Sequence, residues 1–424
     1  MNVSRFAPSS LRTARAATPT RWRQPYRSFS KRSDPLRILF CGSDEFSVAS
    51  LKALHNEHKK TGTGLIQSID VVVRPSKPTG RGYKVLREVR LQAFAKELNL
   101  PIHVRDTFTG WDMPKPDDEP INLIIAVSFG LFVPPRLIHA SKYGGLNVHP
   151  SMLPDLRGPA PIHHALLAER PFTGITIQTL SPENFDAGVH LAQTPPPGIA
   201  IPTGCTPDHL QQVLAPEGAR MLVEALRAGL HVPPYEKEEE ACQQRAPVAT
   251  TTETPPLHAP KITTQDRQVL WTAQTARQVV VRQRVLGPLW THLRLPGKDG
   301  VKEAEGSEKR AILDEISVVG GPPGREHASA GTSDRTTGTG TSSADGDVVW
   351  VQKTPVPQTK EEKKARAALR WETESVTSPY WVNVDGEAVI VPMGEESWLR
   401  IGRIKVEGST FKPARTVLGG KGSK

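Results

Sequence analysis

The residues whose chemistry stands out lie in the stretch 145–154, with the sequence GLNVHPSMLP. Leu146 and Val148 alternate there with Asn147 and His149, a pattern typical of a strand, so the amide and the imidazole share one face. The prolines that follow hold the next loop in non-helical shapes. A carboxamide beside an imidazole at a strand end can stabilise a developing oxyanion and move a proton. We interpret Asn147 and His149 as candidate catalytic residues, with purely structural hydrogen bonding as the alternative.

A third candidate, Asp186, lies in the stretch 183–189, with the sequence ENFDAGV. It falls in a turn between strands expected at 173–180 and 189–193, where an Asp often does no more than shape the turn. Ligands of open parallel sheets collect beyond the carboxyl ends of the strands, so one crevice could hold all three candidates. The carboxylate of Asp186 could then fix the tautomer of His149 and stabilise its protonated form.

The elements that must position these residues alternate between strands and helices along the first half of the chain. This alternation predicts a parallel sheet that is covered on both faces. Strands are expected at 36–40, 69–73, 102–104 and 121–127, and helices at 44–55, 89–98, from Pro159 or Pro161 to Glu169, and at 207–228, the last broken or restarted at Pro216. Asp44 or Ser43 is expected to cap the first helix. Gly42 supplies one of the three glycines of a dinucleotide-binding fingerprint, so NAD or FAD binding is not expected.

The second half of the chain has a different composition. Residues 231–260 are rich in Pro, Thr and Glu and lack an apolar period, which predicts a linker between a catalytic domain at 36–230 and a second domain at 261–419. In the second domain a helix is expected at 273–285, and short strands at 289–295, 388–391, 398–401 and 404–406. A disordered insertion is expected at about 297–370, interrupted by a strand-like stretch at 311–319. The predicted fold is α/β, a Rossmann-like parallel sheet followed by a smaller β-barrel-like domain of the OB type.

The positive charge of the chain is concentrated at its N-terminus. The formal net charge is +10, and residues 1–33 contain eight Lys and Arg and no Asp or Glu. Arg and Ser enrichment without acidic residues predicts a mitochondrial transit peptide at 1–33, and hence a location in the mitochondrial matrix. A basic tail that binds nucleic acid is the alternative. No apolar run reaches the roughly 18 residues that cross a bilayer. Three cysteines without C-x-x-C spacing predict neither a disulfide framework nor a zinc site.

Taken together, these features resemble the methionyl-tRNA formyltransferases, a branch of the 10-formyltetrahydrofolate-dependent transformylase superfamily. The Asn-x-His strand, the SMLP loop and the FDAG turn match the signature of the superfamily, and the segment RGPAPI matches a more specific formyltransferase segment. The resemblance extends from about Leu36 to Ala228, and more weakly over 261–295 and 388–418.

The resemblance implies direct transfer of a formyl group, without a metal or a covalent intermediate. By analogy, Asn147 hydrogen-bonds the formyl oxygen, His149 adds to that stabilisation and passes on the proton of the amine, and Asp186 orients and charge-balances His149. The co-substrate implied is 10-formyltetrahydrofolate. The resemblance places it against Phe129, Gly130, Ser151, Met152, Leu153 and Pro154.

The basic loop at 74–84, with the sequence RPSKPTGRGYK, carries the implied contact with tRNA. Read from the residues alone, it is a solvated loop that follows the second strand. In the family, a Pro-x-Gly-Arg-Gly loop enters the acceptor stem, and Arg81 matches its key arginine, whose fork can bridge phosphates or stack on bases. Lys77 and Lys84 in this loop, and Arg403 and Lys405 in the second domain, are the other residues expected to contact tRNA. This chain departs from the common family pattern at Arg74–Lys77, usually Gln-Pro-Asp-Arg, and at Asp155, where a basic residue is frequent.

The expected function is therefore formylation of initiator methionyl-tRNA for mitochondrial translation, by a monomer without membrane contact. Another transformylase of the superfamily, or a hydrolase that releases formate, can share the Asn, His and Asp set. A folate- or RNA-binding protein that has lost catalysis is a third reading.

Overall fold

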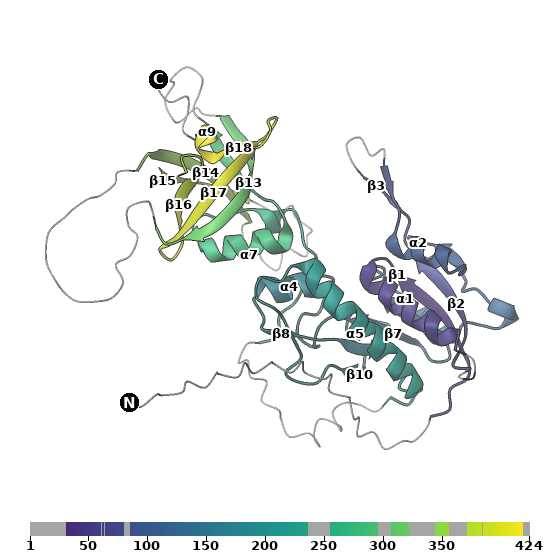
Figure 1. Cartoon of the computed structure of the whole chain (residues 1–424). Helices are drawn as coiled ribbons and strands as arrows, with labels where there is room; N and C mark the ends of the chain where they lie inside the picture. The colour runs from purple at the N-terminus through teal and green to yellow at the C-terminus, as the bar shows by residue number, and fades with distance from the viewer. Residues whose placement is uncertain are drawn as a thin grey trace, which may run out of the picture.

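A computed structural model describes residues 31–60, 62, 64–79, 85–235, 255–295, 307–321, 344–355, 371–383 and 385–418 (Figure 1). The apolar runs of the first half form a seven-stranded sheet in the order β10-β9-β7-β6-β1-β2-β5. Its strands are β1 (Leu36–Gly42), β2 (Ile66–Val73), β5 (Ile102–Val104), β6 (Leu123–Val127), β7 (Gly145–His149), β9 (Thr176–Thr179) and β10 (His190–Gln193). The first five strands named are parallel, whereas β9 runs antiparallel to β7 and β10 antiparallel to β9. This confirms the predicted Rossmann-like sheet.

The central strand β1 is buried on both faces. Ile38 and Phe40 point into the core beneath helices α1 (Glu45–His58) and α5 (Pro207–Arg227), whereas Leu39 and Cys41 point into a second cluster on the other face. Successive strand residues point to opposite faces, so a continuous apolar run is what a strand covered on both sides requires. Asp44 caps α1 by accepting a hydrogen bond from the backbone N–H of Ser47 at 3.0 Å, which settles the choice between Asp44 and Ser43.

The prediction that the helix over 207–228 breaks at Pro216 is wrong, because α5 continues through that residue. A proline removes one backbone hydrogen bond, to the carbonyl four residues earlier. Pro216 and Gln212 both lie on the exposed side of α5, where water can satisfy the freed carbonyl. Meanwhile the buried stripe that includes Leu214 and Leu222 continues on the opposite side. The remaining elements of this half are short: β3 (Lys77–Thr79), β4 (Val85–Arg87), α2 (Arg90–Glu97), η2 (Pro116–Asp118), α3 (Pro135–Ala140), α4 (Pro161–Leu167), β8 (Phe172–Thr173) and β11 (Ile199–Ala200).

The second half forms a closed antiparallel barrel, as predicted. Of the seven strands in this sheet, six close into the barrel, because β13, the first in the sheet order, also pairs with β17, the sixth. The elements are η3 (Gln265–Arg267), α7 (Ala276–Leu286), β12 (Leu289–Leu295), β13 (Ser307–Val319), β14 (Gly346–Pro355), β15 (Trp371–Val382), β16 (Val389–Met393), β17 (Ser397–Val406), β18 (Lys412–Pro413) and α9 (Ala414–Leu418). Helix α7 lies between the barrel and α4 of the first half (Figure 1).

The prediction of a disordered insertion at about 297–370 includes residues that form barrel strands. Its stretch at 311–319 is part of β13, as predicted, but β14 at Gly346–Pro355 is also a barrel strand. Trp350 of β14 is fully buried and stacks on Trp271, with ring centroids 4.0 Å apart. The short apolar run of β14 follows a long Gly/Ser/Thr/Asp stretch, and this context concealed the strand. Residues 296–306, 322–343 and 356–370 lie outside the described residues.

The end of the predicted linker belongs to the first half. The backbone of Leu257 and Ala259 pairs with the loop after β7: Leu156 N–H donates to Leu257 O and Ala259 N–H to Arg157 O, both at 2.7 Å. Gly158 makes this approach possible, because a Cβ on it would lie 2.4 Å from the carbonyl oxygen of Ala259. Residues 255–260 therefore form an additional layer on this loop.

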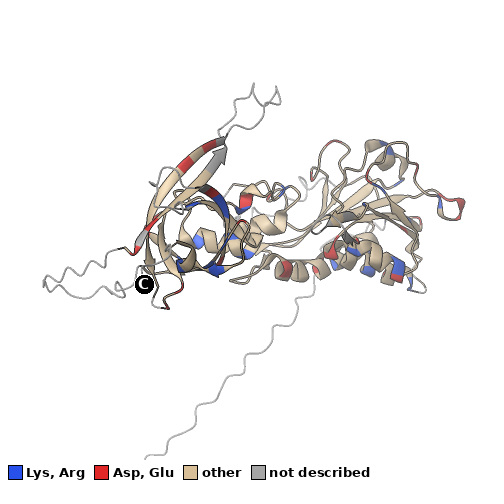
Figure 2. Ribbon diagram, turned by 90° about the horizontal axis from the view of Figure 1, so that it is seen from above, with Lys and Arg blue, Asp and Glu red and all other residues tan. Residues whose placement is uncertain are grey.

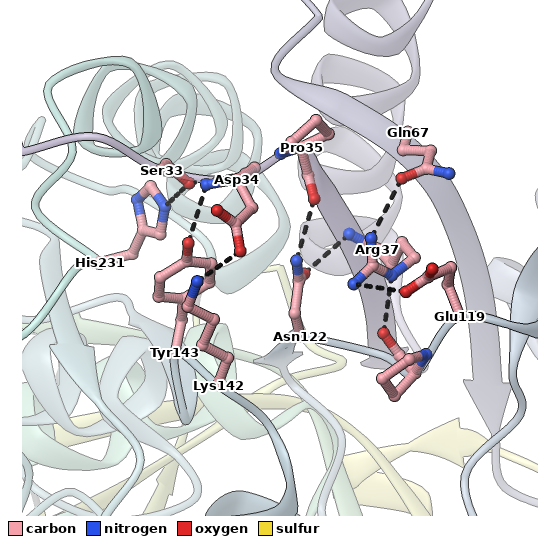
Figure 3. Close-up of polar contacts among 11 residues, drawn as sticks. Ser33, Asp34, Pro35, Arg37, Gln67, Glu119, Asn122, Lys142, Tyr143 and His231 are labelled. Carbon is pink, nitrogen blue, oxygen red and sulfur yellow. Dashed lines mark hydrogen bonds and ion pairs between the residues drawn. The ribbon is translucent and has the colours of Figure 1, made fainter.

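Residues 31–33, predicted as the end of the leader, contact the folded domain. Lys31 Nζ donates to Val232 O at 3.1 Å. Ser33 Oγ lies 2.8 Å from Nε2 of the buried His231 (Figure 3). Burial lowers the pKa of His231 to about 4, so this ring is neutral at pH 7. Asp34 continues the contact through Tyr143 and Lys142. The predicted leader thus overlaps the fold by three residues, and residues 1–30 lie outside the described part of the chain.

Charges are mixed over the described chain. Lys and Arg lie among Asp and Glu in both halves (Figure 2), and α5, for example, pairs Arg220 with Glu217 and Glu224. No helix among the described residues is long and apolar enough to span a membrane.

The amide of Asn122 is predicted to stabilise the entry of the chain into β1. It is 2% exposed; its Nδ2 donates to Pro35 O at 2.9 Å and its Oδ1 accepts from Arg37 N–H at 2.8 Å (Figure 3). Asn122→Ala leaves both backbone groups unpaired and should lower the free energy of unfolding by about 1–3 kcal/mol, measured by urea titration. Gln67→Ala, which removes only an exposed contact with Arg37, is the control. Equal effects of the two substitutions contradict the assignment.

Candidate active site

The structure brings the three predicted catalytic residues together around the carboxylate of Asp186. Its Oδ1 lies 3.1 Å from Asn147 Nδ2 and 3.3 Å from His149 Nδ1. Two groups that the sequence did not single out complete the cluster: Gln178 Nε2, 3.2 Å from the same oxygen, and Gly158 N–H, which donates to Oδ2 at 3.0 Å. The predicted convergence of the three side chains is thus present in the geometry, and four donors face one carboxylate.

Strand register places three members of the cluster. On the paired strands β7 and β9, Asn147 lies opposite Gln178 and His149 lies opposite Thr176. Opposite residues of an antiparallel pair project from the same face, so the two amides are neighbours. Asn147 also pairs with Ala126 near the carboxyl end of β6. The cluster therefore lies where the parallel strands end, as expected for a ligand site in such a sheet.

Asp186 reaches the cluster through the turn between β9 and β10. Asp186 adopts a left-handed backbone conformation with φ of 51°, which Asp tolerates better than most residues. Two residues later the turn crosses β9 so closely that a Cβ on Gly188 would lie 1.7 Å from Thr179 O. In the Asp-Ala-Gly sequence, Asp186 tolerates the left-handed conformation of the turn. Gly188 lacks the Cβ that would collide with Thr179 where the turn crosses β9.

His149 is fixed from both sides. The residue is 4% exposed, with Nδ1 of its ring facing Asp186 and Nε2 lying 3.1 Å from Leu156 O. A carbonyl oxygen and an ionised carboxylate both accept hydrogen bonds, so the ring donates to both only when both nitrogens carry a proton. The arrangement therefore holds the imidazole in one orientation.

The environment of Asp186 favours its ionised form. Burial raises the pKa of this carboxyl group, but the hydrogen bond and charge of His149, with the donors Gly158 and Gln178, outweigh burial and lower the pKa from its ordinary value. Hydrogen bonds to the charged form of a carboxyl group stabilise that form. At neutral pH the cluster therefore contains a buried negative charge.

The loop at Ser151–Pro154 lies beside the cluster and is held by two polar side chains. Thr176 Oγ1 donates to Ser151 O at 2.8 Å and accepts from Leu153 N–H at 3.1 Å, while Gln193 Nε2 donates to Leu153 O at 2.8 Å. These backbone groups, expected to face folate, are thus already hydrogen-bonded within the chain. Met152 lies against Gly174 and Gly198, where a Cβ would come within 2.8 Å of its side chain.

Aromatic side chains line the segment after β6. Phe129 is buried and packs against Phe108, with centroids 6.0 Å apart, and Gly130 O accepts a long hydrogen bond from Arg74 at 3.4 Å. Phe185, next to Asp186, is 63% exposed and meets the Phe132 ring edge-on at 5.2 Å. An exposed ring packed against a half-buried one, beside a polar cluster, is a surface suited to a flat ring. The sequence reasoning did not identify this pair.

The residues predicted to contact tRNA are placed only in part. Arg81 and Lys84 lie outside the described residues, and of Lys77 only the backbone, at the start of β3, is described. Arg403 and Lys405 lie on one face of β17 and both approach the ring of Phe411, at 5.4 and 5.8 Å. Asp155, which replaces a residue often basic in the family, accepts from Arg170 at 3.2 Å and from Leu257 N–H at 2.8 Å. Its role in the structure is therefore to hold the segment at 255–260.

Among the described residues, no group of three His, Cys, Asp or Glu side chains could hold a metal ion. The side chains of the cluster can donate and accept hydrogen bonds and move protons.

The ionised state of Asp186 predicts how stability depends on pH. Because its pKa is lower in the folded chain, Asp186 contributes stability that is complete above its unfolded pKa, about 3.9, and is lost as the pH falls through the folded value. The difference in free energy of unfolding between wild type and Asp186→Asn should be constant near neutral pH and shrink in acid, measured by chemical unfolding. Circular dichroism at each pH controls for acid unfolding. A difference that grows in acid contradicts the prediction.

This chain is similar to several known proteins. Residues 36–226 match the family model described as "Formyl transferase". Methionyl-tRNA formyltransferase, mitochondrial, of Saccharomyces cerevisiae is 35% identical over 342 residues, covering 72% of this chain and 82% of the relative. The human protein of the same name is 32% identical over 273 residues, covering 64% of this chain and 62% of the relative. The solved structure of the sugar N-formyltransferase WlaRD has 11% identity and a TM-score of 0.43, over 88% of this chain and 99% of that chain. By its identity to the Saccharomyces cerevisiae enzyme over most of both chains, this chain belongs to the methionyl-tRNA formyltransferase family.

Proposed function

We propose that this chain transfers the formyl group of 10-formyltetrahydrofolate to the amino group of methionyl initiator tRNA, in the mitochondrial matrix. The observation that carries the proposal is the contact of Asn147, His149 and Asp186 at the carboxyl edge of the sheet in a member of this family. The names of the relatives support the substrate and the mitochondrial location.

In the proposed reaction, the amine attacks the formyl carbon, a new C–N bond forms, and the bond from that carbon to the folate nitrogen breaks. A carboxamide carries two N–H donors. One N–H of Asn147 is held by Asp186, so the other can donate to the formyl oxygen as it becomes an oxyanion. His149, with Asp186, relays the proton: the imidazole gives a proton to the folate nitrogen that leaves and takes one from the amine.

The proposed folate surface comprises Phe129, Gly130, Ser151, Met152, Leu153 and Pro154. Its support is positional, because Phe129 and Gly130 follow β6, the neighbour of the strand that carries Asn147. Since the polar groups of the 151–154 loop are bonded to Thr176 and Gln193, we assign that loop a shaping role. The exposed ring of Phe185 and the half-buried ring of Phe132 extend the proposed surface.

The tRNA is proposed to contact both halves of the chain, through Lys77, Arg81 and Lys84 on one side and Arg403 and Lys405 on the other. The proposed division is a catalytic domain from 36 to about 230, completed by residues 255–260, and a tRNA-binding barrel up to 419. Helices α4 and α7 lie between the two, where Arg277 pairs with Glu169 at 2.8 Å.

Incubation of the purified chain with 10-formyltetrahydrofolate and methionyl-tRNA should yield formyl-methionyl-tRNA. Asn147→Ala should lower kcat roughly 10²–10³-fold, because one oxyanion donor is lost, without changing the unfolding midpoint greatly. Asn184→Ala, an exposed amide in the turn that carries Asp186, is the matched control. Release of formate without formylated tRNA would identify a hydrolase instead, and folate binding without either product a binding protein.

Arg81→Ala should raise the KM for methionyl-tRNA at least tenfold, as roughly 1.4 kcal/mol of binding is lost, and should leave folate binding nearly unchanged. The reason is that a guanidinium contacts phosphates and bases rather than the pterin. Steady-state kinetics with each substrate varied, and fluorescence titration of folate, measure the two effects. Arg90→Ala, an exposed residue paired with Glu45, is the control. Equal losses for both substrates contradict the proposed role.

A further inference from the structure

Gln178 supplies a side chain of the cluster that neither the sequence pattern nor the resemblance identifies. It lies on β9, is 1% exposed, and directs Nε2 to the oxygen of Asp186 that also faces Asn147 and His149. An ionised carboxylate only accepts hydrogen bonds, so this contact orients the amide with its nitrogen toward Asp186. The orientation of this side chain is thus determined by Asp186.

The amide oxygen of the same side chain is unusual in its lack of a hydrogen bond. Gln178 Oε1 is buried and has no hydrogen-bond partner among the described residues. Buried polar atoms in native proteins almost always have a partner, and an orphaned one reduces stability. A methionine or leucine at this place would fill the space without that penalty. A glutamine here is therefore better explained by what its nitrogen does for Asp186 than by what the side chain does for the fold.

We propose that Gln178 is a positioning residue for formyl transfer, which holds the Asp186 carboxylate in place between Asn147 and His149. The inference rests on the proposed function. Without the amide, Asp186 keeps Gly158 N–H as its fixed backbone donor, but its Oδ1 is held only by the two side chains that must act on the substrate. Gln178 thus fixes the carboxylate from a third direction, so that the orientation of Asn147 and His149 does not depend on their mutual contact alone.

Its loss should also alter the protonation of Asp186. His149 on β7 is the ionisable group in contact with that carboxylate; Glu183 belongs to the same turn, and Asp155 and Arg157 belong to the loop that supplies Gly158. The Gln178 amide lowers the pKa of Asp186 together with His149 and Gly158. Removing the amide therefore moves the pKa of Asp186 upward, and the acid limb of a kcat profile that requires the carboxylate moves upward with it.

The test compares Gln178→Met with wild type at saturating levels of both substrates. We expect kcat to fall roughly 10- to 100-fold, as for a lost hydrogen bond to a charged group, the acid limb to move to higher pH, and the thermal midpoint to change too little to account for the lost activity. Gln178→Glu, which places a second carboxylate beside Asp186, should lower kcat further at neutral pH. A fall in the midpoint that accounts for the lost activity, with an unchanged pH profile, would show a merely structural role and overturn the inference.

Gln193→Met is the matched control on the neighbouring strand. It removes the same amide group, which holds Leu153 and Thr176 rather than Asp186. We expect it to raise the KM for the folate while leaving the acid limb in place. If both variants move the limb equally, the proposed role of Gln178 is wrong. If wild type itself forms no formyl-methionyl-tRNA, the proposed function fails instead, and the pH dependence of unfolding of Gln178→Met still tests the contact with Asp186.

Discussion

A carboxylate removed from water is stable only where hydrogen-bond donors replace the water. Asp186 meets this requirement with donors from three segments that are distant in the sequence: β7, β9 and the loop at 155–160. Each donor is positioned by its own element, and none of these segments could shift alone without leaving the charge less well compensated. The requirement of one buried charge therefore ties together the strand pairing, the loop and the turn of the site.

The same requirement explains the glycines around the cluster. Gly188 lets the turn of Asp186 cross β9 at Thr179, and Gly158 lets residues 255–260 pack on the loop whose N–H faces the carboxylate. At both positions a Cβ would collide with a backbone carbonyl, which cannot move aside as the end of a flexible side chain can. Backbone approach, rather than chain flexibility, is what these glycines provide.

Local patterns in the sequence were sufficient for the catalytic strand and for most of the sheet. The alternation at 145–149 predicted that Asn147 and His149 share a face of the strand. The position of Asp44, just before a helical pattern of apolar residues, predicted it as a candidate cap of α1. The role of Gln178 could not be predicted in this way, because an isolated glutamine on a four-residue strand has no pattern that marks it. Its contact depends on the register of β7 with β9 and on a turn that returns to the sheet.

The pairing of Leu257 and Ala259 with the loop after β7 determines where the chain can be divided. Composition suggests a junction near residue 230, yet the backbone of Leu156, Arg157 and Ala160 is completed by residues beyond that point. An exchange of the barrel for another module must therefore join the chain after Pro260, whose carbonyl lies 3.0 Å from His164 Nε2 on α4. A junction placed earlier would remove the backbone hydrogen bonds that residues 257–259 make with the loop after β7. That loop supplies Gly158 N–H, the backbone donor to the Asp186 carboxylate.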